Sequence, residues 1–421
     1  MSASSPKAAR LGPPDSGLIS VEEARARILA AVQPLDAETV PIAMAHGRVA
    51  AEDLAARLDH PPDPVSAMDG YALRSDDVGD MPLRLRKIGV SRAGERFKGR
   101  LTPGACVRIF TGAVIPEGAD VIAIQEDAEE DGEDVIIREA APKGRFIRRA
   151  GLDFSTGQLL IPAGRAISAR DLGLLASSGH GEVAVRRRPR IAILSTGDEL
   201  VPPGAIPGPD QIVGSNGIAL AAAVESWGAE AVEIGIAADE TQAIAEAADR
   251  AQGADILITS GGASAGDHDL VQAGIAERGF VPDFWRIAMR PGKPLMFGRI
   301  GELPVLGVPG NPVSALVCAM LFLRPAIRKM LGMTESLPQF ERVRLAVAMG
   351  PNDQREEYGR GRLERDPDGA LTVRPFNAQD SAMQKLLAQA DCLIRRPPHA
   401  PAADAGEEVE VLRLDLVEGG F

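Results

Sequence analysis

The chain has 421 residues, a hydrophobic fraction of 45% and an aromatic fraction of only 4%. This length predicts about three domains, with cores built from aliphatic side chains. The formal net charge of −13 argues against nucleic acid as a main partner, because neutralising phosphates takes a basic face. The three widely spaced cysteines indicate a reducing compartment, and no apolar run of about 18 residues predicts a membrane span. We therefore expect a cytoplasmic protein.

In chain order, residues 1–15 have the composition of a disordered segment. Residues 18–33 have the periodicity of an amphipathic helix, with Ser20 as its N-cap. From residue 61 to residue 149, short alternating runs separated by Gly, Pro and Asp predict a small all-β domain. Residues 150–186 return to a helix and short strands. We therefore expect residues 16–60 and 150–186 to share one discontinuous domain, which the β domain interrupts.

Residues 187–333 open with RIAILSTG, an apolar run without alternation that is typical of a parallel strand buried on both faces. Strands and helices then alternate, which predicts a doubly wound α/β domain. Residues 334–421 return to short strands and predict a small C-terminal β-barrel or sandwich. The expected fold class is therefore multidomain α/β and β: a central doubly wound α/β domain, an inserted β domain, a discontinuous helical–strand domain and a C-terminal β-barrel.

Three unusual loops follow strands of the α/β domain, at the sheet edge where such folds bind ligands. They are STGDEL at 195–200, TSGGASAGDHDL at 259–270 and VPGNPVSA at 308–315. The glycines of the second loop suit a backbone that wraps an anion, and Ser264 adds a hydroxyl donor. Asp267 and Asp269 suit Mg²⁺ beside a phosphate, although either one alone could simply cap the next helix.

The third loop leads into a helix, for which Asn311 is the expected cap and Pro312 the first residue. Free N–H groups at this helix start would attract a phosphate or another oxyanion; the alternative is a capped helix without a ligand. Asp239 also follows a strand, and it is either a helix N-cap or a ligand at the same edge. Glu199 shares that position in its own loop.

Positive charge gathers in WRIAMRPGKPLMFG, residues 285–298. Arg286, Arg290 and Lys293 flank a Pro-Gly turn there. Arginine clamps planar oxyanions and lysine acts as a point charge, so this stretch of an acidic protein predicts a polyanion site. Surface solubilisation is the alternative.

A series of motifs resembles those of the molybdopterin molybdenumtransferases, the family of MoeA and the gephyrin E domain. In order, they are SAMDGYA, RIFTGAVIP, STGDEL, SNG, TSGGASAGDHD, AMRPGKPLMFG and VPGNPVSA. The resemblance covers about residues 16–420. It implies a four-domain homodimer, with the discontinuous domain as linker and dimerisation domain. Its active site would lie between the α/β domain of one subunit and the inserted β domain of the other. The implied reaction inserts molybdate into the dithiolene of adenylylated molybdopterin and releases AMP, with Mg²⁺ as cofactor.

The resemblance also implies a role for individual residues. The catalytic set would be Asp69, Thr111, Glu199, Asp239 and Asp269, with the first two reaching the site from the partner subunit. The metal ligands would be Asp239, Asp267 and Asp269. The substrate would be bound by Ser264, Arg286, Arg290, Lys293, Pro309, Gly310, Asn311, Arg360 and Ser381. Two features depart from the family: arginine stands at 286 and 290 where lysine is frequent, and NAQDSAM replaces the usual Gly-Ser-Gly around Ser381.

Two other functions remain open at this stage. The related adenylyltransferase that activates molybdopterin with ATP shares the α/β domain, but it usually lacks the AMDGYA module and the terminal β domain. A non-enzymatic molybdopterin carrier or scaffold would bind the ligand without turning it over.

Overall fold

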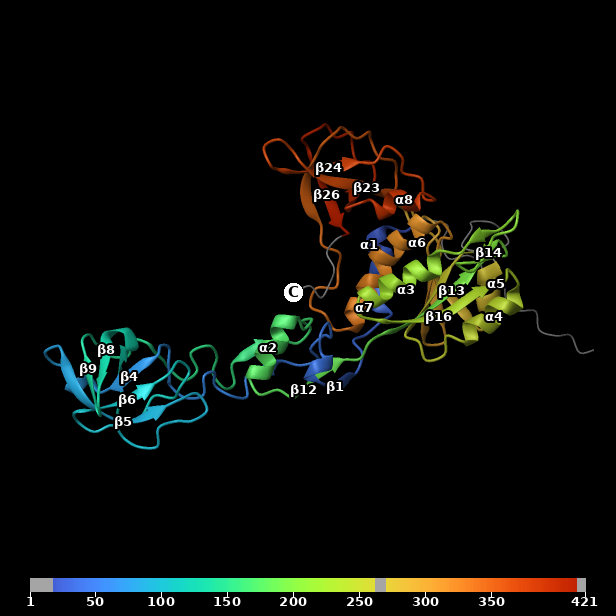
Figure 1. The fold of residues 1–421 in the computed structure, drawn as a ribbon. Coiled ribbons are helices and arrows are strands. Elements are labelled where there is room, and N and C mark those ends of the chain that lie inside the picture. The colour runs from blue at the N-terminus through green and yellow to red at the C-terminus, as the bar shows by residue number, and fades with distance from the viewer. Residues whose placement is uncertain (1–17, 262–269, 415–421) are drawn as a thin grey trace, which may run out of the picture.

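The computed structural model describes residues 18–261 and 270–414, which form an elongated molecule (Figure 1). The segment expected to be disordered, residues 1–15, lies outside these ranges. No helix in the described residues is both long and apolar enough to cross a membrane. In Figure 1 the inserted β domain stands at one end and the α/β domain and C-terminal barrel at the other.

The α/β domain is built on a six-stranded sheet with the strand order β16-β13-β17-β21-β20-β18. The first four strands are parallel, whereas β20 and β18 are antiparallel additions at one edge. The strands are β13 (Arg190–Thr196), β16 (Glu230–Ala237), β17 (Ile256–Ser260), β18 (Phe280–Phe284), β20 (Met296–Ile300) and β21 (Leu303–Val308). The short strands β14 (Leu200–Val201) and β15 (Ile212–Val213) pair beside the sheet.

Helices cover both faces of this sheet, and the sequence of β13 shows why. Ile191 and Ile193 join a core with α1, α3, α6 and α7, whereas Ala192 and Leu194 join a second core with α4 and α5. Successive side chains of a strand point to opposite faces, so a strand covered on both sides must be apolar throughout. The helices are α1 (Val21–Ala30), α3 (Asn216–Ser226), α4 (Thr241–Asp249), α5 (Leu270–Ala276), α6 (Pro312–Cys318) and α7 (Arg324–Met330).

The apolar stretch after residue 312 is not one regular helix. A π-helical turn, Ala319–Leu323, separates α6 from α7. Pro325 lies in the first turn of α7. Proline has no N–H and crowds the preceding turn. The wider π-helical turn accommodates it, so that α6 and α7 follow each other without a loop.

The discontinuous domain joins two distant stretches of chain. β1 (Ala37–Pro41) pairs antiparallel with β12 (Glu182–Arg186), and β2 (Leu54–Ala55) pairs with β11 (Leu159–Ile161). A short 3-10 turn (Ile42–Met44) and α2 (Ala169–Ser177) complete it. Helix α1 instead packs in the core of the α/β domain, with the Ser20 hydroxyl accepting from the Glu23 N–H. The residue boundaries between domains stay a prediction.

The inserted β domain is a six-stranded sheet with the order β7-β4-β6-β5-β9-β8. Its strands are β4 (Gly70–Leu73), β5 (Leu83–Ser91), β6 (Ala105–Ile109), β7 (Val121–Ile124), β8 (Ala128–Asp131) and β9 (Asp134–Ile137), with a side pair β3 (Val65–Ser66) and β10 (Ile147–Arg148) and 3-10 turns at Ser75–Asp77 and Gln125–Asp127. At its base the chain enters and leaves side by side. The His60 N–H donates to Phe154 O at 2.9 Å, and the two rings stack with centroids 5.4 Å apart.

The C-terminal domain is a barrel closed by five strands. Its strands are β22 (Glu341–Leu345), β23 (Glu356–Arg365), β24 (Leu371–Pro375), β25 (Cys392–Arg396) and β26 (Glu408–Arg413), and pairing of β23 with β25 closes the cycle. A short helix, α8 (Gln384–Ala388), faces the α/β domain, and β19 (Met289–Arg290) of that domain pairs with β23. The predicted fold class is thus confirmed.

Candidate functional site

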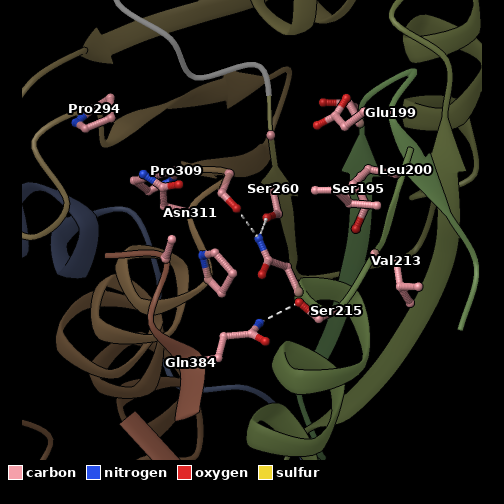
Figure 2. A pocket seen from close by; sticks show the side chains of 18 of the residues that line it. Ser195, Glu199, Leu200, Val213, Ser215, Ser260, Pro294, Pro309, Asn311 and Gln384 are labelled. Atoms are coloured by element: carbon pink, nitrogen blue, oxygen red, sulfur yellow. Dashed lines mark hydrogen bonds between the residues drawn. The ribbon is translucent and has the colours of Figure 1, made fainter. Parts of the chain in front are cut away.

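A cleft of about 720 Å³ opens at the carboxyl ends of β13, β17 and β21, the edge that the sequence predicted. The lining residues come from the loops after these strands, the starts of α3 and α6 and a segment of the C-terminal barrel (Figure 2). Six of the predicted site residues line this cleft: Glu199, Arg286, Lys293, Pro309, Gly310 and Asn311.

Close packing of the loops forms the floor of the cleft. Gly261 has φ +110°, and a Cβ there would lie 2.2 Å from the Thr196 carbonyl oxygen. Only glycine fits such a position. Asn216 then ties the loops together, since its Nδ2 donates to Ser260 Oγ and to the Gly310 carbonyl, both at 2.8 Å (Figure 2). Sequence reasoning gave Asn216 no role; the signal was the SNG motif at a helix start.

The predicted cation cluster divides into two parts. Arg286 and Lys293 are exposed and line the cleft. Within the described residues Lys293 has no ion-pair partner, so its charge is available to an anionic ligand. Arg290 is not among the residues that line the cleft, and its part in the predicted polyanion site stays a prediction. Pairing of β19 with β23 carries Arg290 to the barrel, where it contacts Glu357 at 2.8 Å and Asp353 at 3.5 Å.

The carboxylates gather around the ends of β13 and β16. The Asp239 N–H donates to Asp198 Oδ1 at 2.9 Å. Burial, followed by the neighbouring charges of Asp198 and Glu199, raises the pKa of the Asp239 carboxyl above its ordinary value. Asp239 is not the N-cap of α4, because Glu240 holds that position. It also lies outside the lining of the cleft.

Three predicted residues of the glycine-rich loop, Ser264, Asp267 and Asp269, lie outside the described residues. In the parts of the chain that are described, no group of three or more His, Cys, Asp or Glu side chains is placed to hold a metal ion.

The barrel segment around Ser381 occupies part of the start of α6. Asn311 occupies the N-cap position, but its side chain makes no capping bond. Its Nδ2 instead donates to Ser381 Oγ at 3.0 Å, and the Val313 N–H donates to the Ser381 carbonyl at 3.1 Å. The expected oxyanion site thus has at least one of its N–H groups already bonded. Ser381 is placed against the cleft wall rather than in its lining.

Arg360 positions that segment without lining the cleft. It is 2% exposed, and it donates from Nε to Gln379 Oε1 at 3.1 Å and from Nη1 to the Asp380 carbonyl at 2.8 Å. Gln379 returns a bond from Nε2 to the Arg360 carbonyl at 2.9 Å. Arg360 therefore sets the path of the segment that carries Ser381.

Replacing Arg360 with methionine is expected to lower the free energy of unfolding by about 3 kcal/mol, because the buried guanidinium makes two charged hydrogen bonds that methionine cannot replace. Denaturant unfolding measures the loss. Arg362→Met, two residues along β23 at an exposed position, is the matched control and should cost much less. Equal losses in both variants would contradict this role.

Asp69 and Thr111 lie together on the inserted β domain. Asp69 Oδ1 accepts from the Thr111 N–H at 2.7 Å and from Thr111 Oγ1 at 2.8 Å. These two bonds, with a smaller contribution from Arg108, hold the pKa of the Asp69 carboxyl below its usual range. Figure 1 shows this domain at the opposite end of the molecule from the α/β domain. The pair therefore does not reach the cleft of its own chain.

Fold and cleft together define a multidomain protein whose α/β domain carries a cleft at the edge of its sheet, with part of the cleft lining supplied by the C-terminal barrel. Family models match it in three stretches: the MoeA N-terminal region (domains I and II) at residues 19–179, a probable molybdopterin binding domain at 192–329 and the MoeA C-terminal region (domain IV) at 342–414.

Relatives match along most of the chain. A molybdopterin molybdenumtransferase of Nostoc is 37% identical, over 90% of this chain and 89% of its own. One from Haemophilus influenzae is 33% identical, over 94% and 98%. The crystal structure of the molybdopterin biosynthesis MoeA protein of Pyrococcus horikoshii matches with a TM-score of 0.83 at 32% identity, covering 94% of this chain and 99% of that one. The chain belongs to the MoeA family.

Proposed function

We propose that this protein inserts molybdate into the dithiolene of adenylylated molybdopterin and releases AMP. The relatives are named molybdopterin molybdenumtransferases, which supports a transferase of molybdenum cofactor biosynthesis. The observation that carries the proposal is the cleft itself. It presents Arg286 and Lys293 at the ligand-binding edge of an α/β domain in an acidic protein.

The charges in the cleft suit a reaction between two anions. Molybdate and the phosphoanhydride of the substrate repel each other, and bringing them together requires fixed positive charge nearby. Arg286 and Lys293 offset this repulsion. The backbone of Pro309 and Gly310 lines the same cleft and limits where the ligand can lie. The dithiolene sulfurs of the substrate bind the molybdenum, so no nucleophilic side chain is needed.

Mg²⁺ is proposed as cofactor. Mg²⁺ typically takes only one or two protein carboxylates and fills its other positions with phosphate oxygens and water, so a complete cage of side chains is not required. The Asp239 carboxyl fits such a ligand, since burial and, after it, the charges of Asp198 and Glu199 raise its pKa, and a bound cation would offset both effects. When bound, the ion would neutralise the phosphoanhydride and orient it. Asp267 and Asp269 are proposed as further ligands.

We also propose a homodimer whose active site is shared, because Asp69 and Thr111 lie at the far end of the molecule from the cleft of their own chain. A second copy can supply the missing pair. Exposed apolar side chains on the discontinuous domain offer a surface for this contact: Met44, Leu58, Leu152 and Leu159 are each more than half exposed. Grouped into one patch, such side chains would favour a protein interface.

Mixing two inactive variants tests the shared site. Asp69→Asn and Lys293→Met are each expected to be inactive, but randomly mixed dimers should recover about a quarter of wild-type activity. Half of the dimers are then mixed, and each has one intact site out of two. Recovery would be measured after co-refolding or co-expression, with each variant alone as control. No recovery, despite confirmed mixed dimers, would refute the shared site.

The function is tested by mixing the purified protein with adenylylated molybdopterin, molybdate and Mg²⁺ and measuring AMP. Release that depends on molybdate supports the transferase, whereas no such release would reject it. Product formation from ATP and molybdopterin would identify the adenylyltransferase, and binding without turnover would identify a carrier.

We also propose a cytoplasmic location, supported by three cysteines that are all free and buried.

A further inference from the structure

One end of the cleft is made by the C-terminal barrel rather than by the α/β domain. Ala382 and Gln384 of the barrel line it there. Gln384 donates from Nε2 to Ser215 Oγ at 2.5 Å, across the mouth of the cleft (Figure 2). Ser215 is the N-cap residue of α3, but its side chain makes no capping bond. The contact therefore joins two domains directly at the site.

Both partners are held firmly on their own sides. The barrel segment is fixed by Arg360 through Gln379 and Asp380 and meets α6 through Ser381. On the other side, Asn216 follows Ser215 and bonds both Ser260 and Gly310. The positions of the two polar groups are thus set before a ligand arrives, which reduces the cost of ordering them on binding.

Hydrogen-bonding capacity remains at this pair. The Ser215 hydroxyl accepts from Gln384 and keeps its own proton to donate. Gln384 Oε1 has no partner in the described residues and is an acceptor. Neither group carries charge, unlike Arg286 and Lys293. Figure 2 shows Ser215 and Gln384 together at one end of the cleft, with Glu199 and Pro294, the neighbour of Lys293, toward the other.

Apolar side chains from β15 line the same cleft, between the pair and Glu199. Ile212 and Val213 line the cleft and are 57% and 42% exposed. Exposed aliphatic side chains in the same cleft as a neutral donor and acceptor suit a planar ring with a polar edge, and suit an oxyanion poorly. Apolar contact with the ring faces and hydrogen bonds to the edge are the usual means by which pockets recognise such ligands.

We propose that Ser215 and Gln384 form a specificity subsite that binds the hydrogen-bonding edge of a fused nitrogen heterocycle, with Ile212 and Val213 against its face. This assignment rests on the proposed function and adds to it the orientation of the ligand: its heterocyclic end lies at the barrel and its anionic end at Arg286 and Lys293. A purine and a pterin share this edge chemistry. Gln384 is thereby a substrate-binding residue supplied by the C-terminal barrel.

The test measures ligand binding by calorimetry with the full chain. The probes are adenosine 5′-monophosphate and 6-hydroxymethylpterin; ribose 5-phosphate, which lacks the base, is the reference. Gln384→Ala is expected to raise the Kd of one heterocyclic probe by about fivefold to tenfold, the effect of one hydrogen bond, and to leave ribose 5-phosphate unchanged. Ser215→Ala should act in the same direction. The probe affected identifies the heterocycle as purine or pterin.

Gln389→Ala is the matched control. This glutamine follows α8 directly, is exposed and does not line the cleft. It should bind every probe as the wild type does. Unchanged affinity for both heterocycles in Gln384→Ala would overturn the proposal. So would an equal loss for ribose 5-phosphate, which would show general loosening, or no binding of either heterocycle by the wild type.

The outcome separates this inference from the proposed function. Molybdate-dependent AMP release by the wild type, together with unchanged heterocycle binding in Gln384→Ala, rejects the subsite alone. A selective loss of heterocycle binding without any AMP release by the wild type would leave the subsite standing and reject the reaction.

Discussion

Lys293→Met is expected to lower kcat/KM for molybdate-dependent AMP release by at least about 100-fold. The Lys293 ammonium lines the cleft, and within the described residues no carboxylate pairs with it. Its charge is therefore available to the reacting anions, and removing one fixed donor from such a site costs about 10²–10³ in rate. Steady-state measurement of AMP release would show this loss.

The matched control is Lys385→Met, which removes an exposed lysine of α8 outside the cleft lining. It should keep wild-type activity. Lys293→Arg keeps the charge with a different geometry and should recover part of the loss. A Lys293→Met enzyme within about threefold of wild type would show that the ammonium does not act on the substrate.

Asp239→Asn is expected to lower the activity of the protein and to raise its stability. If the carboxylate holds Mg²⁺, its amide should lower turnover by about 100-fold, by analogy with losses of metal-supporting groups. The same change should raise the melting temperature of the ligand-free, metal-free protein at neutral pH. Asp239 is partly buried beside two further carboxylates, so its ionisation opposes folding.

The raised pKa of Asp239 also determines how the stability difference between wild type and Asp239→Asn changes with pH. Below the pKa of an ordinary aspartate, near 3.9, Asp239 is protonated in the folded and unfolded chain, and the two proteins should melt alike. As the pH rises through the folded pKa, wild type pays the cost of ionising a crowded group and the variant does not. The stability gap therefore opens on going from acid to neutral pH.

Thermal melts at several pH values and the AMP assay measure both effects. Glu240→Gln, at the exposed N-cap of α4, is the control and should change neither. A destabilised Asp239→Asn protein at neutral pH would contradict the repulsion argument. Full activity in a stabilised variant would instead show that Asp239 is not a ligand of the proposed metal ion.

The order of elements could be predicted because it rests on local patterns. The unbroken apolar run at 191–194 required cover on both faces, and Ile193 and Leu194 do enter different cores. The parallel strands in turn placed Glu199 and Gly310 at one edge of the sheet. The start of α6 was predicted from Pro312, whose fixed φ and missing N–H suit the first helical position.

Contacts between distant segments could not be predicted in this way. Arg290 stands near Lys293 in sequence, but pairing of β19 with β23 turns it to Glu357. Asn311 meets Ser381 rather than the helix that it precedes. The Gln384–Ser215 contact spans 169 residues and depends on how the barrel docks. Local composition carries no information about such pairings.

The stacked rings of His60 and Phe154 mark a neck where the chain enters and leaves the inserted β domain at almost the same point. A domain whose ends meet can be removed or exchanged without stretching the chain on either side. Recombination at this point can therefore replace the inserted β domain, which carries Asp69 and Thr111, while the cleft of the α/β domain stays intact. The half of the proposed shared site that carries Asp69 and Thr111 can therefore be exchanged as one unit, without a change in the chain that forms the cleft.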